Sequence, residues 1–427
     1  METENIPIIS VTGTKGKTTV VSIIADILRR SKCNVLHVDT SGHFVNGERR
    51  SVAADSMHIW GIRTVTAMPG KYLGSFLCDQ TLQQSPVAVL ECSFSCKSHG
   101  LGYATHKVGV FLNVFEDHID PRGPIKNKQD LAEAKSFIFS SIADNGYAVF
   151  NADDEFVCGA LRRIPRDKHI QFIPCGLSFE HFDLPRHLAA GGVAITVETD
   201  NVVLKSASQT TVLCALKVLP WTFNGSFTPS VMNMLHACGA VYGFFDGKLP
   251  KDSRELFDAT RLSPQTGRLV VTKAANGTVV IGDYAHEKQS LKAIASLGRS
   301  LIEGSGKLIG VVRLAHERSD ESLQDTSRTI AEAFDEVVVY DKIDGYWRKP
   351  GKPVIKRYPQ VVGRTSEIVA AAIKERNSNV TRILREDEAI AFAAKRASSE
   401  DVVVVILNDN ISRSLDFIKQ EFHTEEV

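Results

Sequence analysis

A short polar loop between a strand pattern and a helix pattern constrains the fold more than any other feature of this chain. Residues 6–11 (IPIISV) have the continuous apolar character of a buried strand. Residues 18–30 (TTVVSIIADILRR) have the apolar period of a helix. The loop GTKGKTT at 13–19 joins the two patterns. A strand, a tight glycine-containing loop and a helix in this order predict the first unit of a parallel α/β sheet.

The glycine spacing of this loop departs from the common phosphate-binding pattern GxxxxGK[ST]. Gly16-Lys17-Thr18 fits the end of that pattern, but Val11 stands at the first glycine position and Gly13 comes three residues before Gly16. Backbone N–H groups near the two glycines can still surround phosphate oxygens at a helix N-terminus. Lys17 is suited to reach the β- and γ-phosphates, and the Thr18 hydroxyl is a potential Mg²⁺ ligand. The alternative is a glycine-rich turn that binds nothing; we predict a nucleoside triphosphate site. Its residues in the loop are Gly13, Thr14, Lys15, Gly16, Lys17, Thr18 and Thr19.

The rest of the chain alternates short apolar runs with amphipathic stretches, as in a parallel sheet covered on both faces. A period-two stretch at 190–215 predicts a hairpin-rich insertion around Thr199-Asp200-Asn201, and a turn-rich stretch near 260–267 separates two βα regions. We therefore predict an α/β protein with two domains. A P-loop parallel-sheet central domain occupies 1–260, and a smaller Rossmann-like α/β domain occupies 261–427. The expected strands are IPIISV, CNVLHVD, SPVAVLE, HKVGVFLNV and NGYAVFN, then VVIGDYA, KLIGVVR, EVVVYD, VTRIL and DVVVVIL. The expected helices include 18–30, 131–142, 229–244 and 411–422.

Composition excludes several classes of function. Fifty basic residues balance fifty acidic ones, so nothing indicates a nucleic-acid or anionic membrane partner. No stretch approaches the roughly 18 apolar residues of a membrane span, and the N-terminus has no secretory pattern. Eight scattered cysteines without a CxxC pair indicate free thiols in a reducing compartment. We expect a cytoplasmic protein; the sequence leaves open whether it forms a homo-oligomer.

Three polar residues follow the first strands at positions suited to a ligand. Glu91 ends an apolar strand, His118 lies in a loop after the next strand, and Lys135 lies on the helix after that. In a parallel sheet, ligands bind beyond the carboxyl ends of the strands, so Glu91 is well placed to hold Mg²⁺ and His118 to hold a second cation. Each residue also has a structural interpretation: Glu91 as a cap, His118 as a partner of a loop carbonyl and Lys135 as a solvated charge.

Taken in order, the motifs resemble those of the Mur ligase superfamily. They are GTKGKTT, Glu91-Cys92-Ser93, NVFEDHID (113–120), AEAK (132–135), NADD (151–154), Thr266-Gly267-Arg268 and Gly282-Asp283-Tyr284-Ala285-His286. The resemblance covers nearly the whole chain. It implies that Thr18 and Glu91 hold a first Mg²⁺ and His118 a second, and that Lys135 is carbamoylated and acts as a further metal ligand. It also implies that Asn233 contacts the adenine and that Arg268 and Asp283 contact ATP from the second domain.

Within the superfamily the chain most resembles the Mur-ligase-like C-terminal half of cyanophycin synthetase, in HVDTSGHFVNGERR (37–50) and in the GLGY that follows Glu91. It departs from the family at Ser93–Lys97, at Ser230 and at His316–Glu321, where a substrate would be recognised. It also lacks the ATP-grasp half of cyanophycin synthetase and the UDP-binding domain of the peptidoglycan ligases. We therefore do not expect a UDP-linked substrate or unaided synthesis of that polymer.

The resemblance implies an ATP-dependent ligase that joins an amino acid or other amine to a carboxylate through an acyl phosphate, with release of ADP and phosphate. Its partners would be a small-molecule or short-peptide acid and an amine that docks on the second domain. One alternative is a poly-γ-glutamate or folylpolyglutamate type of ligase, for which Arg313, Arg318 and Arg348 are candidate glutamate contacts. A non-catalytic ATP-binding subunit and a P-loop kinase are others. The sequence identifies neither the acid nor the amine.

Overall fold

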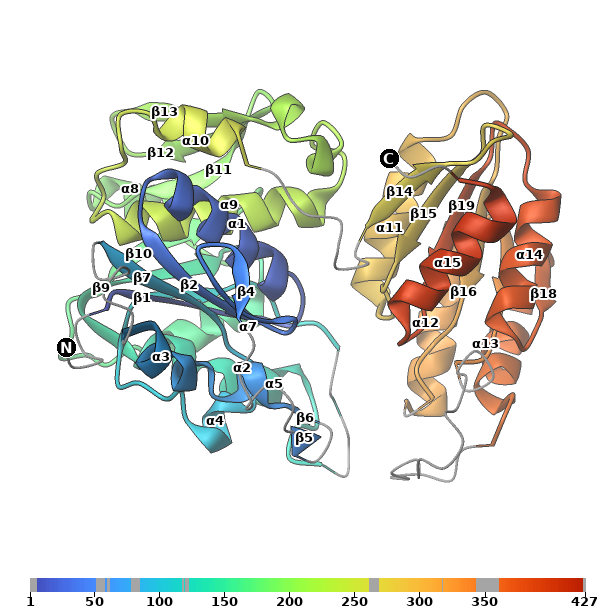
Figure 1. Cartoon of the computed structure of the whole chain (residues 1–427), viewed down its shortest axis with the longest axis horizontal. Helices are drawn as coiled ribbons and strands as arrows, with labels where there is room; N and C mark the ends of the chain where they lie inside the picture. Colours follow the sequence, from blue (N-terminus) through green and yellow to red (C-terminus); the bar gives the residue numbers. More distant parts are fainter. Residues whose placement is uncertain are drawn as a thin grey trace. The chain divides into compact units, whose positions relative to one another are not determined.

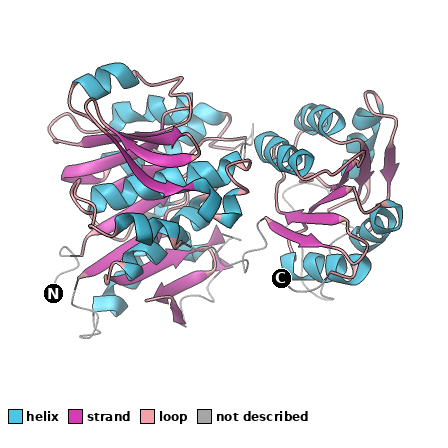
Figure 2. Ribbon diagram, turned by 90° about the horizontal axis from the view of Figure 1, so that it is seen from above, coloured by secondary structure: helices cyan, strands magenta, loops and turns pink. Residues whose placement is uncertain are grey.

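The chain divides into two compact units, Met1–Leu262 and Ser263–Val427 (Figure 1). The computed structural model describes residues 6–50, 58–59, 62–77, 85–116, 119, 123–260, 269–316, 318–342 and 361–424. Each unit has a sheet of its own with helices on both faces, so the predicted α/β class is confirmed (Figure 2). No helix within these ranges is both long and apolar enough to cross a membrane.

The first unit is built on a sheet with the strand order β13-β12-β11-β10-β9-β8-β1-β7-β2-β3-β4. The strands from β11 to β2 in this order run parallel, and antiparallel strands extend the sheet at both ends. The strands are β1 (Ile8–Thr12), β2 (Asn34–Asp39), β3 (Gly42–Val45), β4 (Glu48–Arg50), β5 (His58–Ile59), β6 (Ile62–Arg63), β7 (Pro86–Glu91), β8 (His106–Phe111), β9 (Ile142–Asn151), β10 (Gln171–Cys175), β11 (Ala194–Glu198), β12 (Asn201–Lys205) and β13 (Thr210–Ala215). The helices are α1 (Lys17–Arg30), α2 (Thr64–Ala67), α3 (Leu73–Leu77), α4 (Cys96–His99), α5 (Lys128–Lys135), α6 (Phe137–Ser140), α7 (Glu155–Ala160), α8 (Leu184–Ala189), α9 (Thr228–Phe244) and α10 (Ser253–Asp258), with 3₁₀ turns η3 (Pro69–Tyr72), η5 (Leu161–Arg163), η6 (Leu216–Val218) and η7 (Pro220–Thr222).

Side chains of β1 alternate between two hydrophobic clusters, one on each face of the sheet. Ile9 and Val11 pack into the cluster under α1 and α9, while Ile8 packs into the cluster on the opposite face. Successive side chains of a strand point to opposite faces, so a strand covered on both sides reads as a continuous apolar run. This is why 6–11 is apolar except at Ser10, whose hydroxyl is hydrogen-bonded to that of Tyr103 (2.6 Å).

The second unit has a six-stranded sheet with the order β14-β15-β19-β16-β17-β18. All neighbours are parallel except β14, which pairs antiparallel with β15. The strands are β14 (Val270–Lys273), β15 (Val279–Asp283), β16 (Leu308–Val312), β17 (Glu336–Val339), β18 (Val380–Arg382) and β19 (Val402–Ile406). The helices are α11 (Lys288–Ser300), α12 (Asp320–Ala333), α13 (Arg364–Lys374), α14 (Glu386–Arg396) and α15 (Ile411–Phe422).

The helix expected over 131–142 is wrong as one element. The chain forms α5, which ends at Lys135, then the single-turn α6, and it has entered β9 by Ile142. At the break, the Ser136 hydroxyl donates to the backbone oxygen of Glu133 (2.8 Å), and the hydroxyl therefore competes with the helix ladder. The expected hairpin is confirmed as β11 and β12, whose turn residues Thr199 and Asp200 have positive φ angles.

Candidate functional site

The polar loop joins the end of β1 to the start of α1. Gly16 precedes α1 with a φ of 85°, a left-handed conformation that glycine adopts without strain. A Cβ atom at Gly16 would lie 2.4 Å from Oδ1 of Asn233 on α9, so a side chain there would displace the Asn233 amide. No side chain caps the N-terminus of α1. Its first turn therefore offers backbone donors of the kind that bind phosphate.

The structure brings Thr18 and Glu91 together beside this loop. The Thr18 hydroxyl donates to Oε2 of Glu91 (2.8 Å), which also accepts from the backbone N–H of Thr40 (3.3 Å). Thr18 and Glu91 are buried. A carboxylate and a hydroxyl are hard oxygen donors, which is the ligand chemistry that Mg²⁺ prefers. No group of three His, Cys, Asp or Glu side chains within the described ranges could hold a metal.

Two lysines converge on one carbonyl of the loop. Nζ of Lys17 donates to the backbone oxygens of Gly13 (3.0 Å) and Thr14 (3.1 Å), and Nζ of Lys135 donates to the same Gly13 oxygen (2.9 Å). Lys135 is buried at the end of α5, and its ammonium lies 5.9 Å from the centre of the Phe94 ring. The loop thus gathers two positive charges, which favour an anion nearby.

The remaining predicted residues are distributed as follows. Thr19 is half-buried on α1, and Asn233 on α9 lies against Gly16. Asp283 ends β15 in the second unit, where its Oδ2 accepts from the backbone N–H of Leu269 (2.8 Å). His118 and Arg268 lie outside the described residues.

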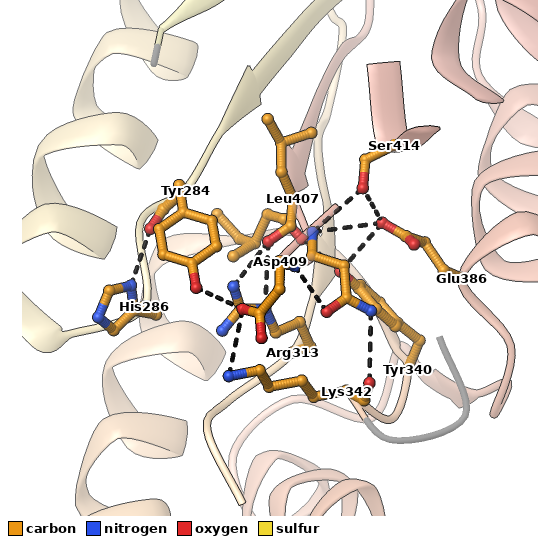
Figure 3. A network of polar contacts seen from close by, with 11 residues as sticks. Tyr284, His286, Arg313, Tyr340, Lys342, Glu386, Leu407, Asp409 and Ser414 are labelled. Carbon is orange, nitrogen blue, oxygen red and sulfur yellow. Dashed lines mark hydrogen bonds and ion pairs between the residues drawn. The ribbon is translucent and has the colours of Figure 1, made fainter. Parts of the chain in front are cut away.

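The second unit has a polar network at the carboxyl ends of β15, β16, β17 and β19 (Figure 3). At its centre, Arg313 is 1% exposed and donates from Nε (3.2 Å) and Nη2 (2.7 Å) to the backbone oxygen of Leu407. Its guanidinium lies 4.8 Å from the centre of the Tyr284 ring, and the Tyr284 hydroxyl donates to Asp409 (2.5 Å). Lys342 forms an ion pair with Asp409 (3.3 Å). One buried cation therefore links the ends of three strands.

Burial perturbs the ionisation of this network. Burial raises the pKa of Tyr284 to about 12, although Arg313 acts in the opposite direction. Burial alone would raise the pKa of Asp409, but Lys342, Tyr284 and Arg313 together hold it below its usual range. Burial also raises the pKa of Glu386. Hydrogen bonds from Ser414 and Asn408 and the charge of Arg313 lower this pKa, but burial outweighs them.

Arg313 was one of three candidate glutamate contacts for the alternative glutamate ligase, and the structure gives it another role. The side chain is buried, and two of its nitrogens bind the Leu407 carbonyl, because a guanidinium at this depth requires internal partners. Arg318 donates to the Thr326 hydroxyl (3.4 Å), and Arg348 lies outside the described residues.

Comparisons with known proteins identify the family. A family model of the Mur ligase middle domain matches residues 11–240, and one of the Mur ligase glutamate ligase domain matches residues 267–406. The first alone spans more than half of the chain. The chain belongs to the Mur ligase family. The resemblance inferred from the sequence motifs is confirmed.

Two curated relatives are similar in sequence to this Mur ligase over nearly its whole length. Cyanophycin synthetase of a Nostoc species is 28% identical over 419 residues, which are 97% of the chain and 42% of the relative. The chain thus spans less than half the length of this relative. A UDP-N-acetylmuramoyl-L-alanyl-D-glutamate–2,6-diaminopimelate ligase of Phocaeicola vulgatus is 22% identical over 429 residues, which are 100% of the chain and 78% of that protein.

Solved structures share the fold of this Mur ligase. FolC of E. coli in complex with DHPP and ADP has a TM-score of 0.65 at 15% identity and matches 97% of this chain and 89% of its own. The folylpolyglutamate synthase of Mycobacterium tuberculosis has a TM-score of 0.64 at 18% identity and matches 100% of this chain and 93% of its own. At such identities the likeness concerns the fold.

Three residues of the site in this Mur ligase were not assigned to it from the sequence. Thr40 binds Glu91 through its backbone, and Asn113 binds the backbone of the polar loop. Asp154 accepts from the backbone N–H of Val114 (2.8 Å) and caps α7. Each follows or lies near the carboxyl end of a strand, and that position is the signal that could have found them.

Proposed function

We propose that this Mur ligase is an ATP-dependent amide ligase, which activates a carboxylate as an acyl phosphate and transfers the acyl group to an amine. The observation that carries the proposal is the buried contact between Thr18 and Glu91 beside a loop that gathers two lysines. Carboxylate oxygen attacks the γ-phosphorus and ADP leaves; the amine then attacks the acyl carbon, and phosphate leaves with loss of a proton. A protein accelerates such steps by positioning groups and stabilising charge.

In the first step, the loop would bind and neutralise the phosphates of the nucleotide. The amides at the start of α1 would bind phosphate oxygens, and Lys17 would leave Gly13 and Thr14 to neutralise charge on the transferring phosphoryl group. Asn233 would contact the nucleotide from α9, next to Gly16. Arg268 and Asp283 stay predicted contacts from the second unit. Closure around the reactants would keep water from the acyl phosphate.

Mg²⁺ fits the oxygen donors present. Thr18 and Glu91 would hold it, and His118 and a modified Lys135 would serve a second ion. Bound there, the cation would neutralise phosphate charge and polarise the phosphoryl group. Glu91 is held in place by Thr18 and Thr40, so its carboxylate needs little reorganisation to act as a ligand.

We infer further that Lys135 is carbamoylated. An ammonium cannot ligate a metal, whereas reaction of the neutral amine with CO₂ gives a carbamate anion and a proton. Two ammonium groups on the Gly13 oxygen, one of them buried, disfavour each other's charge, and conversion of one to an anion turns repulsion into attraction. Intact-mass and ¹³C NMR measurements under ¹³CO₂ test this directly, with a Lys135→Arg variant as the control that cannot react.

The names of the relatives suggest where to look for substrates. Cyanophycin synthetase and the diaminopimelate ligase point to amino acids or short peptides as acid and amine. For the glutamate-adding alternative, Arg313 is a poor candidate for a glutamate contact, since it is buried and bound to Leu407.

Hydroxamate formation tests the proposal. The protein is mixed with Mg²⁺-ATP, hydroxylamine and pools of amino acids, aspartyl and glutamyl peptides, and folates. Hydroxamate with matching ADP release in one pool is the expected result, and Lys17→Ala lowers its rate on the order of 100-fold. Lys374→Ala, an exposed lysine on α13, is the matched control. ATP turnover that leaves phosphate on a stable product would establish a kinase instead.

A further inference from the structure

Asn113, which follows β8, lies against the first half of the polar loop. Its Oδ1 accepts from the backbone N–H groups of Thr14 (3.1 Å) and Lys15 (2.9 Å), and its Nδ2 donates to the backbone oxygen of Lys15 (3.1 Å). The N–H of Thr14 also donates to the backbone oxygen of Asn113 (3.0 Å). The Asn113 side chain thus bonds with backbone N–H groups of two successive residues, Thr14 and Lys15, and with the carbonyl of Lys15.

Neighbouring contacts attach the same half of the loop to the same segment. The backbone N–H of Phe115 donates to the Thr14 hydroxyl (3.1 Å), and a Cβ atom at Gly13 would lie 2.8 Å from Cβ of Leu112. The loop therefore packs closely on residues 112–115 along Gly13, Thr14 and Lys15.

The chemistry of the contact requires an amide side chain. Asparagine can accept from two N–H groups with its oxygen and donate from its nitrogen. Aspartate accepts but cannot donate to the Lys15 oxygen, and alanine does neither. Because the amides of Thr14 and Lys15 are bound to Asn113, backbone donation to phosphate falls to Gly16, Lys17 and Thr18.

We propose that Asn113 is a positioning residue that holds the first half of the loop, so that the amides of the second half are pre-organised for the phosphates of a nucleotide. The inference rests on the proposed nucleotide binding. A loop already fixed in its binding conformation loses less conformational freedom when the ligand arrives, so the contact strengthens binding without touching the ligand. Thr14 and Lys15 then serve the site through their backbone geometry.

Nucleotide affinity provides the first test. Titration calorimetry with Mg²⁺-ADP compares the full chain with Asn113→Ala and with Asn377→Ala. Asn377 is a matched control: its side chain accepts from the N–H of Asn379 (2.9 Å) and donates to the Phe334 oxygen (2.8 Å), in the second unit. We expect Asn113→Ala to raise Kd roughly 10-fold, as for loss of about 1.4 kcal/mol, and Asn377→Ala to leave it unchanged. An unchanged Kd in Asn113→Ala would overturn the proposal.

Hydrogen exchange in the nucleotide-free protein provides a second readout. The amides of Thr14 and Lys15 should exchange faster in Asn113→Ala than in the unaltered chain, whereas Asn377→Ala should leave them protected. Equal protection in both variants would refute the positioning role whatever binds the loop. If the unaltered chain does not bind Mg²⁺-ADP at all, the proposed function fails, while the exchange result still decides whether Asn113 orders the loop.

Discussion

At the scale of single residues, Glu91 is the side chain whose charge matters most. Glu91→Gln keeps an oxygen for Thr18 and Thr40 but removes the negative charge that would bind Mg²⁺. We expect the melting temperature to change little and the rate of ATP-dependent hydroxamate formation to fall on the order of 100-fold, with a higher Mg²⁺ requirement. Glu133→Gln, which alters a half-buried partner of Arg163, should change neither rate nor Mg²⁺ requirement. An unaltered Mg²⁺ titration in Glu91→Gln would remove Glu91 from the metal site.

A second prediction at this scale concerns Glu386 and the pH dependence of stability. Burial raises its pKa, so the folded state holds the proton more tightly than the unfolded chain does. The resulting stabilisation is present below the ordinary value of 4.5 and is lost as pH rises through the folded-state pKa. Glu386→Gln should therefore melt at a higher temperature than the unaltered chain at pH 8, and the difference should shrink toward pH 4. A difference that is constant with pH would show that Glu386 ionisation does not limit stability.

The sequence predicted part of this residue-scale picture. Thr18 and Glu91 could be named because a hydroxyl after a lysine and a carboxylate at a strand end are recognisable types at recognisable positions. The positions of Asn113 and Thr40 after strands were a usable signal, but their contacts were not. Bonds between a side chain and distant backbone, 99 residues apart for Asn113 and Thr14, leave no periodic trace in the sequence. Burial of Arg313 was also invisible, since an arginine after an apolar strand reads the same whether it faces solvent or a core.

At the scale of elements, Gly16 permits the left-handed turn into α1 beside Asn233 of α9. Gly16→Ala puts a methyl group 2.4 Å from Oδ1 of Asn233 and forces a left-handed φ of 85° on alanine, which costs about 1–2 kcal/mol. We expect a lower melting temperature together with weaker Mg²⁺-ADP binding. Gly159→Ala on α7, where an added methyl meets no atom within 4 Å, should be neutral or stabilising. Equal melting temperatures for the two variants would contradict the role given to Gly16.

Elements were predictable where one face or both faces are buried. The apolar runs that became β1, β7, β8 and β19 needed no further information, because both sides of these strands meet helices. The break between α5 and α6 was missed, since the apolar pattern continues across Ser136, where the hydroxyl and the backbone N–H both donate to the Glu133 oxygen. The hairpin of β3 and β4 turns at Asn46-Gly47, with φ angles of 52° and 88°; this is a strong turn signal that we used only as a point of resemblance.

At the scale of the whole molecule, the two units offer a calorimetric test of a shared nucleotide site. Each has its own sheet and core, so we expect two unfolding transitions. A ligand at 100 times its Kd stabilises the unit that binds it by about 2.7 kcal/mol. If Arg268 and Asp283 contact the nucleotide as proposed, Mg²⁺-ADP should raise both transitions, and Asp283→Asn should remove only the shift of the second. A shift of the first transition alone, in the unaltered chain, would mean that the first unit binds the nucleotide by itself and that the role of Asp283 lies within the second unit, where it accepts from the backbone of Leu269.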